Sequence, residues 1–194
     1  MKRSSKRGVR FRGCRTVQVL LLVLFGLVPL VPMPVVDCPC DHAKAGSMQS
    51  RVCSLCGTAE RATEEVYFLK DINPHKPNRY LALPKAHAAG YQSTADLSPR
   101  LRAELWRKAA ARGEELFPGR WGVAQNSHFF RTQCHAHLHI GPLSPEVQDT
   151  DGTLYGRVEE IPDVGPEQGI WLHPKQDGFC VHLDRDLAEI VLIR

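Results

Sequence analysis

The sequence predicts an α+β domain in which one long helix packs on a mostly antiparallel sheet. Short runs rich in β-forming residues are separated by turn-forming residues, and a single stretch has the apolar spacing of a helix. The chain of 194 residues suits one domain with an appendage. Its 43% hydrophobic and 24% charged content excludes a collagen, a coiled coil and a wholly disordered chain.

Two strands and their turn are expected at residues 65–84. Val66–Leu69 is rich in β-forming residues, and Tyr80–Leu83 follows a turn made of Asn, Pro, His and Lys at 73–78. These residues predict an antiparallel hairpin.

The helix is expected to begin after Ser98. This serine suits the N-cap, and Pro99 suits the first helical position. Apolar residues then recur at helical spacing, at Leu101, Leu105, Ala109 and Leu116. The helix should end before the Pro-Gly pair at 118–119.

Four more strands are expected after the helix, at 121–125, 135–140, 179–183 and 190–193. Residues 144–168 are rich in Pro, Gly, Asp and Glu and predict a long loop.

The first 36 residues indicate a basic leader with a signal or anchor segment. Seven basic and no acidic side chains occur there, and the apolar stretch 17–36 would span about 30 Å as a helix. Three interpretations stay open: an uncleaved membrane anchor, a secretory signal cleaved near Ala43–Ala45, or a cytosolic protein whose start has been misread. In the first two, the basic flank stays inside and residues 37–194 lie outside the cytoplasmic membrane, anchored on the periplasmic side or released after cleavage.

Residues 37–62 are expected as a cysteine-containing lead-in and 63–194 as the main domain. Residues 37–194 carry a net charge of −3, which argues against nucleic-acid binding. The spacing of Cys53 and Cys56 suits a metal ion, with a disulfide as the rival in an exported protein. Cys38 and Cys40 could pair with each other, join the other two or do neither.

Histidines occupy alternate positions at 135, 137 and 139. On a strand they would share one exposed face, while Ala136, Leu138 and Ile140 would face the helix. Cys134 is expected to be a small core residue. The alternative is a surface histidine cluster or a zinc site without a catalytic role.

The run His135-x-His137-x-His139 resembles the signature of the histidine-triad superfamily of nucleotide hydrolases and transferases. Residues 84–87 resemble the upstream Pro-Lys-x-His element of that superfamily, and Asn126 stands where the family has a substrate-binding Asn. The longer string 131–140 is similar to the CDP-diacylglycerol pyrophosphatases, which are also anchored at the N-terminus. The resemblance covers about residues 53–147.

The resemblance implies a histidine-triad-like fold with His137 as the nucleophile, forming a phosphohistidine-type intermediate, and His139 as a donor to phosphate oxygens. It also implies substrate binding by four further residues, which are Asn126, Arg131, Thr132 and Gln133. In many bacterial members of the superfamily one structural zinc is bound at the positions of Cys53, Cys56, His87 and His135.

The function expected first is hydrolysis of a phosphoanhydride in a nucleotide-containing substrate, with CDP-diacylglycerol giving CMP and phosphatidate. The first alternative is an exported nucleotide hydrolase or nucleotidyl transferase with a soluble substrate. The second is a non-catalytic zinc- or nucleotide-binding module. A homodimer is compatible with the sequence.

Overall fold

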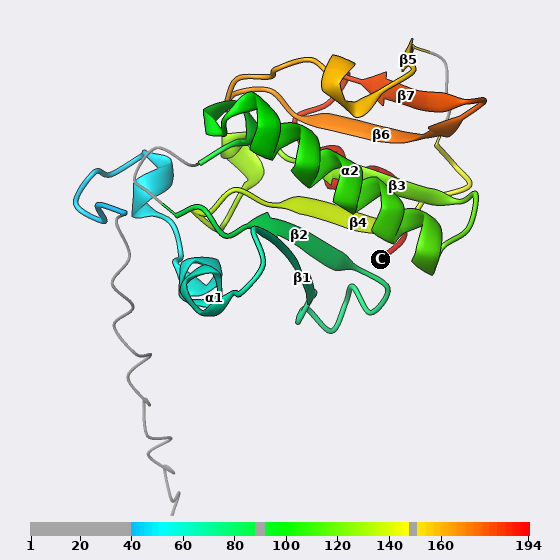
Figure 1. Ribbon diagram of the computed structural model, residues 1–194. Coiled ribbons are helices and arrows are strands. Elements are labelled where there is room, and N and C mark those ends of the chain that lie inside the picture. Colours follow the sequence, from blue (N-terminus) through cyan, green and yellow to red (C-terminus); the bar gives the residue numbers. More distant parts are fainter. Residues whose placement is uncertain (1–39, 88–91, 148–150) are drawn as a thin grey trace, which may run out of the picture. The chain divides into compact units, whose positions relative to one another are not determined.

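The computed structural model describes residues 40–87, 92–147 and 151–194 (Figure 1). The expected leader, its apolar stretch 17–36 and Cys38 lie outside these residues. Within the described ranges, no helix has the length and apolar character needed to cross a membrane.

The described residues form one seven-stranded sheet in the order β1-β2-β4-β3-β6-β7-β5, and every neighbouring pair is antiparallel. The strands are β1 (Val66–Lys70), β2 (Tyr80–Pro84), β3 (Trp121–Gln125), β4 (Leu138–Pro142), β5 (Thr153–Tyr155), β6 (Ile170–Lys175) and β7 (Gly178–His182). The predicted α+β class with a mostly antiparallel sheet is confirmed.

Two α-helices accompany the sheet in the described residues, α1 (Ser54–Arg61) and α2 (Pro99–Leu116). Short 3-10 helices connect the elements: η1 (Met48–Ser50), η2 (Thr94–Asp96), η3 (His128–Phe130), η4 (Val158–Glu160) and η5 (Ala188–Val191). α2 lies across one face of the sheet (Figure 1), and its buried side chains share a core with inward-facing strand residues such as Val123 and Leu172. Ala124 follows Val123 in β3, and Trp171 precedes Leu172 in β6, so both point to the opposite face of the sheet. There, η5 packs on them.

The predicted helix and hairpin are confirmed. The Ser98 hydroxyl accepts a hydrogen bond from the Leu101 amide at 3.3 Å, and Pro99 opens α2. β1 and β2 pair from Val66↔Pro84 to Lys70↔Tyr80. The strand expected at 121–125 is also present, as β3.

Several other elements differ from the prediction. The lead-in contains α1, the expected loop 144–168 contains β5 and η4, and β6 was not predicted at all. The strand expected at 190–193 is absent, and η5 ends there with one isolated bridge between Leu143 and Leu192. The reason is that the Arg79 guanidinium binds the carbonyls of Glu189, Leu192 and Ile193, so a side chain takes the place of a neighbouring strand.

The histidine strand begins later than predicted. β4 starts at Leu138, because the preceding segment pairs with the lead-in through Val52, which donates to the Thr132 carbonyl and accepts from the Cys134 amide. The expectation of an exposed histidine face is wrong. His135, His137 and His139 are only 1%, 5% and 7% exposed.

Candidate active site and metal centre

A cavity of about 400 Å³ brings together every residue predicted for catalysis or substrate binding. Those six residues are His137, His139, Asn126, Arg131, Thr132 and Gln133. Charged residues that sequence reasoning did not assign also line it, namely Lys70, Asp71, Lys76 and Glu189. Apolar side chains, among them Leu69, Ile72 and Phe130, complete the wall. A pocket with an apolar wall and a few polar groups is typical of a small-molecule site.

His137 is held in one tautomer by its backbone neighbour. Its Nδ1 lies 2.8 Å from the carbonyl oxygen of His135. Because a carbonyl only accepts, Nδ1 carries the proton and Nε2 keeps its lone pair. Burial, together with the nearby His139 and Arg131, lowers the pKa of His137 well below its ordinary value. The imidazole is therefore neutral at physiological pH, as a nucleophile requires.

His139 lies beside His137 and beside a carboxylate. The two imidazole centroids are 4.9 Å apart, and the Nδ1 of His139 is 3.5 Å from a carboxylate oxygen of Glu189. Burial lowers the pKa of His139 to about 4, although Glu189 acts in the opposite direction. His139 is thus also neutral near pH 7.

Glu189 is the centre of a largely buried charge cluster that no sequence pattern indicated. Its carboxylate is 2.7 Å from the Lys76 ammonium and 3.2 Å from the Arg79 guanidinium. Burial alone would raise the pKa of Glu189, but His139, Lys76 and Arg79 together lower it to about 2. Asn126 donates to the same carboxylate at 3.2 Å and accepts from the Glu189 amide at 2.8 Å. The predicted substrate-binding Asn therefore also holds Glu189 at the cavity.

Arg131 brings a buried positive charge to the cavity wall. The residue is 3% exposed, and its Nη2 donates to the carbonyls of Cys134 and His135 at 3.5 and 3.0 Å. Its Nε and Nη1 donate to no atom of the described residues. Burial lowers the pKa of Arg131 to about 10, so the group is still a cation near neutral pH. Such a group favours an anionic ligand, because guanidinium geometry matches phosphate oxygens.

The loop at 132–133 is attached to the lead-in. The side-chain oxygen of Gln133 accepts from the Ser54 hydroxyl at 3.0 Å and from the Leu55 amide at 3.4 Å, where α1 begins. This helix start therefore depends on a residue far away in the sequence. Since the oxygen of Gln133 is occupied, only its amide nitrogen is left to donate to a ligand.

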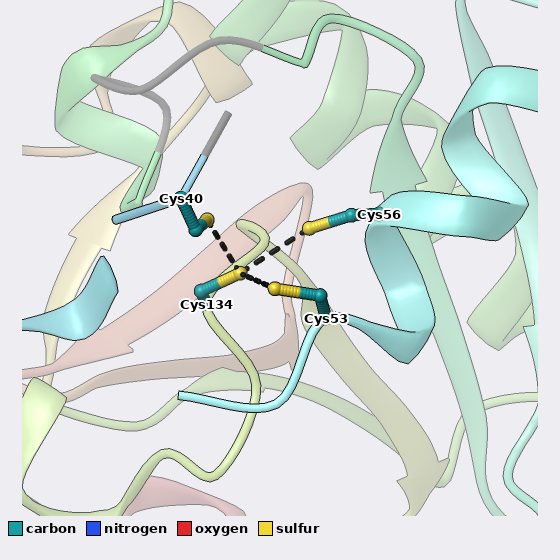
Figure 2. Close-up of side chains that lie close together, drawn as sticks. All are labelled: Cys40, Cys53, Cys56 and Cys134. Carbon is teal, nitrogen blue, oxygen red and sulfur yellow. Dashed lines mark hydrogen bonds between the residues drawn. The ribbon is translucent and has the colours of Figure 1, made fainter. Parts of the chain in front are cut away.

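Four cysteine sulfurs meet next to this loop (Figure 2). The sulfur of Cys134 is 2.7 Å from that of Cys40, 3.2 Å from that of Cys56 and 3.5 Å from that of Cys53. All four sulfurs lie within 4.8 Å of one another, and no disulfide joins any two cysteines in the described part of the chain. The four cysteines are therefore close enough to bind a metal ion, and a closed set of four thiolates is compatible with structural zinc.

The predicted zinc ligands are divided between two groups. Cys53 and Cys56 belong to the four-sulfur cluster, whereas His87 and His135 form a second group with Cys56. His135 donates through Nε2 to the Pro84 carbonyl at 2.8 Å, and its ring centroid is 5.3 Å from that of His87.

Cys134 is buried as expected, but its position at the centre of the sulfur cluster was missed. Of the choices left open for Cys40, joining Cys53 and Cys56 is the one observed. The only sequence signal for a four-cysteine site was the number of cysteines in the chain.

Comparisons of the chain with models of known protein families and with curated proteins found no match. The histidine-triad resemblance therefore rests on the motif residues and stays a prediction. The cavity and the sulfur cluster are the observations on which a function can be argued.

Proposed function

We propose that this protein hydrolyses a phosphoanhydride bond of a nucleotide-containing substrate through a covalent intermediate on His137. The observation that carries the proposal is the shared cavity of a neutral imidazole and a buried cation. His137 has its proton on Nδ1 and its Nε2 lone pair available, and Arg131 lines the same cavity with two nitrogens that lack partners among the described residues. A nucleophile beside a phosphate-binding group is the arrangement that stepwise phosphoryl chemistry needs.

The reaction takes two displacements at phosphorus. In the first, Nε2 of His137 attacks the nucleotide phosphorus, an N–P bond forms, and the bond to the bridging oxygen breaks, releasing the second phosphate group. Arg131 and the amide nitrogen of Gln133 offset the charge that builds on the phosphate oxygens. In the second, water attacks the same phosphorus, the N–P bond breaks, and a nucleoside monophosphate and a proton are released.

CDP-diacylglycerol is the substrate that we propose first, with CMP and phosphatidate as products. Apolar side chains are exposed beside the cavity, since Ile72 is 96% and Phe130 49% exposed and both line it. Phe129 next to them is 63% exposed. Exposed apolar residues around a polar site suit a substrate with a lipid part. The expected anchor at 17–36 would also keep the site beside a membrane.

A soluble nucleotide is the second candidate, and the size of the cavity favours it. About 400 Å³ is room for a nucleotide, but not for two acyl chains as well. An exported nucleotide hydrolase or nucleotidyl transferase would need no lipid contact at Ile72, Phe129 and Phe130.

We also propose that the four-cysteine cluster holds a structural zinc ion. Cys40, Cys53 and Cys56 come from the lead-in, and Cys134 directly follows Gln133. An ion there would bind the lead-in to the loop that carries Arg131 and Gln133, and would not touch the substrate. Its contribution is to stability, as for other closed thiolate sites.

The test is a substrate panel with the purified full-length chain. CDP-diacylglycerol in mixed micelles, ADP-ribose and a dinucleoside polyphosphate are compared for release of a nucleoside monophosphate. We expect His137→Ala to lose more than about 1,000-fold in kcat, because no other cavity residue offers a nucleophile with this geometry. His75→Ala, at an exposed histidine in the β1–β2 turn, is the matched control and should keep wild-type activity.

The outcomes separate the candidates. Turnover of CDP-diacylglycerol alone supports the lipid substrate, and turnover of the soluble compounds supports the second candidate. A folded His137→Ala variant with near wild-type activity would reject the nucleophile. Tight nucleotide binding without turnover of any substrate would leave a binding module instead of an enzyme.

A further inference from the structure

The hairpin of β6 and β7 carries a second cluster of metal-ligating side chains, formed by His173, Cys180 and His182. Their ligand atoms all lie within 4.8 Å of one another. None of the three lines the catalytic cavity, and none belongs to the four-cysteine cluster. The residues are separate from everything that the proposed function uses.

The register of the hairpin places the three side chains on one face. His173 is directly opposite Cys180, and His182 is two residues further along β7, opposite Trp171. Side chains two apart on a strand share a face. The alternate residues, Leu172 and Val181, lie in the core beneath α2, so the cluster is on the face away from that helix.

The three side chains of the cluster are buried. His173, Cys180 and His182 are 7%, 1% and 2% exposed. Two imidazoles and one thiol are ligands for a borderline transition metal, whereas Mg²⁺ and Ca²⁺ prefer oxygen.

Neighbouring groups fix the tautomer of one imidazole and the ring position of the other. The Nδ1 of His173 lies 3.0 Å from the Pro174 carbonyl, which can only accept, so the proton is on Nδ1 and the lone pair on Nε2. The ring of His182 stacks on Trp171, with centroids 3.7 Å apart and planes 5° apart. The Trp171 indole in turn donates to Asp184 at 2.7 Å. Such support around the ligands is typical of metal sites.

Gly152 packs closely against two of the ligand atoms. A Cβ built on this residue would lie 2.6 Å from Nε2 of His182 and closer still to the sulfur of Cys180. Any side chain at 152 would therefore overlap these two atoms and push them apart. Only a glycine at this position lets both ligand atoms stay where they are.

We propose that His173, Cys180 and His182 form a second metal site, which binds a borderline divalent ion such as Zn²⁺. The Cys180 thiol loses its proton to solvent on binding, and the three protein ligands leave a fourth position for water or another small ligand. His182 also lines a cavity of about 420 Å³ beside Asp151 and Asp184, through which an ion and its fourth ligand can enter.

The test is metal stoichiometry of the full-length chain, measured by elemental analysis after loading with Zn²⁺ and removal of excess ion. We expect the Cys180→Ser variant to hold one ion fewer per chain than wild type. Gly152→Val should lose the same ion although every ligand is intact. Asp177→Asn, at an exposed position in the β6–β7 turn, is the control and should keep the wild-type number.

Loading with Co²⁺ identifies the ligands independently of activity. The thiolate-to-cobalt absorption of the wild-type chain should weaken by the contribution of one thiolate in Cys180→Ser, and it should weaken to the same extent in Gly152→Val, in which every cysteine is kept. Equal zinc content in wild type, Cys180→Ser and Gly152→Val would overturn the proposal. If Cys180→Ser fails to fold, the Gly152→Val stoichiometry decides in the same way. Turnover in the substrate panel is not part of this readout, so the two proposals can fail separately.

Discussion

Replacing Glu189 by glutamine removes one negative charge from a largely buried cluster and keeps the shape of the side chain. The carboxylate contacts Lys76, Arg79 and His139, and it is 14% exposed. Arg79 is 1% exposed, so the substitution leaves a cation in the interior with only carbonyl partners. The amide oxygen of glutamine can still accept from Asn126, but the amide nitrogen then faces the Lys76 and Arg79 donors. The variant therefore removes the charge together with one acceptor.

The lowered pKa of Glu189 sets the size of the effect. Its pKa falls from an ordinary 4.5 to about 2 in the folded protein. At about 1.4 kcal/mol per pH unit, this shift corresponds to roughly 3 kcal/mol of stability. Because the folded pKa is the lower one, this stability is fully present above pH 4.5. It is lost as the pH falls from 4.5 towards 2.

The assay is urea unfolding of wild type and Glu189→Gln between pH 7 and pH 3. We expect the variant to be about 3 kcal/mol less stable at pH 7, with a difference that shrinks steadily below pH 4.5. Glu167→Gln, at an exposed carboxylate, is the control and should change stability by less than about 0.5 kcal/mol. A Glu189→Gln difference that is independent of pH would refute the assignment of a buried, charged Glu189.

Three further predictions concern stability. Ser98→Ala should cost about 1 kcal/mol in urea unfolding, because the Leu101 amide loses its cap at the start of α2. Gly113→Val should cost about 1–3 kcal/mol, since a Cβ at this position lies 2.9 Å from the Trp121 ring, and a wild-type melting temperature would contradict this packing. A strong chelator should lower the melting temperature of wild type by more than that of Cys56→Ser, and an equal shift in both would argue against a metal in the four-cysteine cluster.

Local sequence signals predicted the elements that depend on neighbours in the chain. The Ser98 cap and the apolar spacing after it are enough to specify α2, and the turn residues at 73–78 specify the first hairpin. α1 has no such signal, because its start is capped by Gln133 from another segment. The strand expected at 190–193 is absent for a similar reason. The carbonyls there are bound by Arg79 from the end of the first hairpin turn.

The candidate site was predicted more completely than the fold around it. All six expected catalytic and substrate-binding residues line one cavity, because they lie on the segment that runs from the end of β3 into its neighbour β4. Glu189 could not be found this way. It is 63 residues from Asn126, and the contact between them depends on how the C-terminal segment returns to the sheet.

By itself, the sequence determined the α+β class, the long helix, the first hairpin and the alternating histidines, since each depends on residues a few positions apart. The tertiary structure decided which groups meet and in which protonation state. Cys40 reaches Cys134 across 94 residues, so the metal-binding set follows from the path of the chain and not from the spacing of Cys53 and Cys56. Burial and one backbone carbonyl fix the neutral tautomer of His137, because only a folded interior removes water from the ring and presents an acceptor to Nδ1.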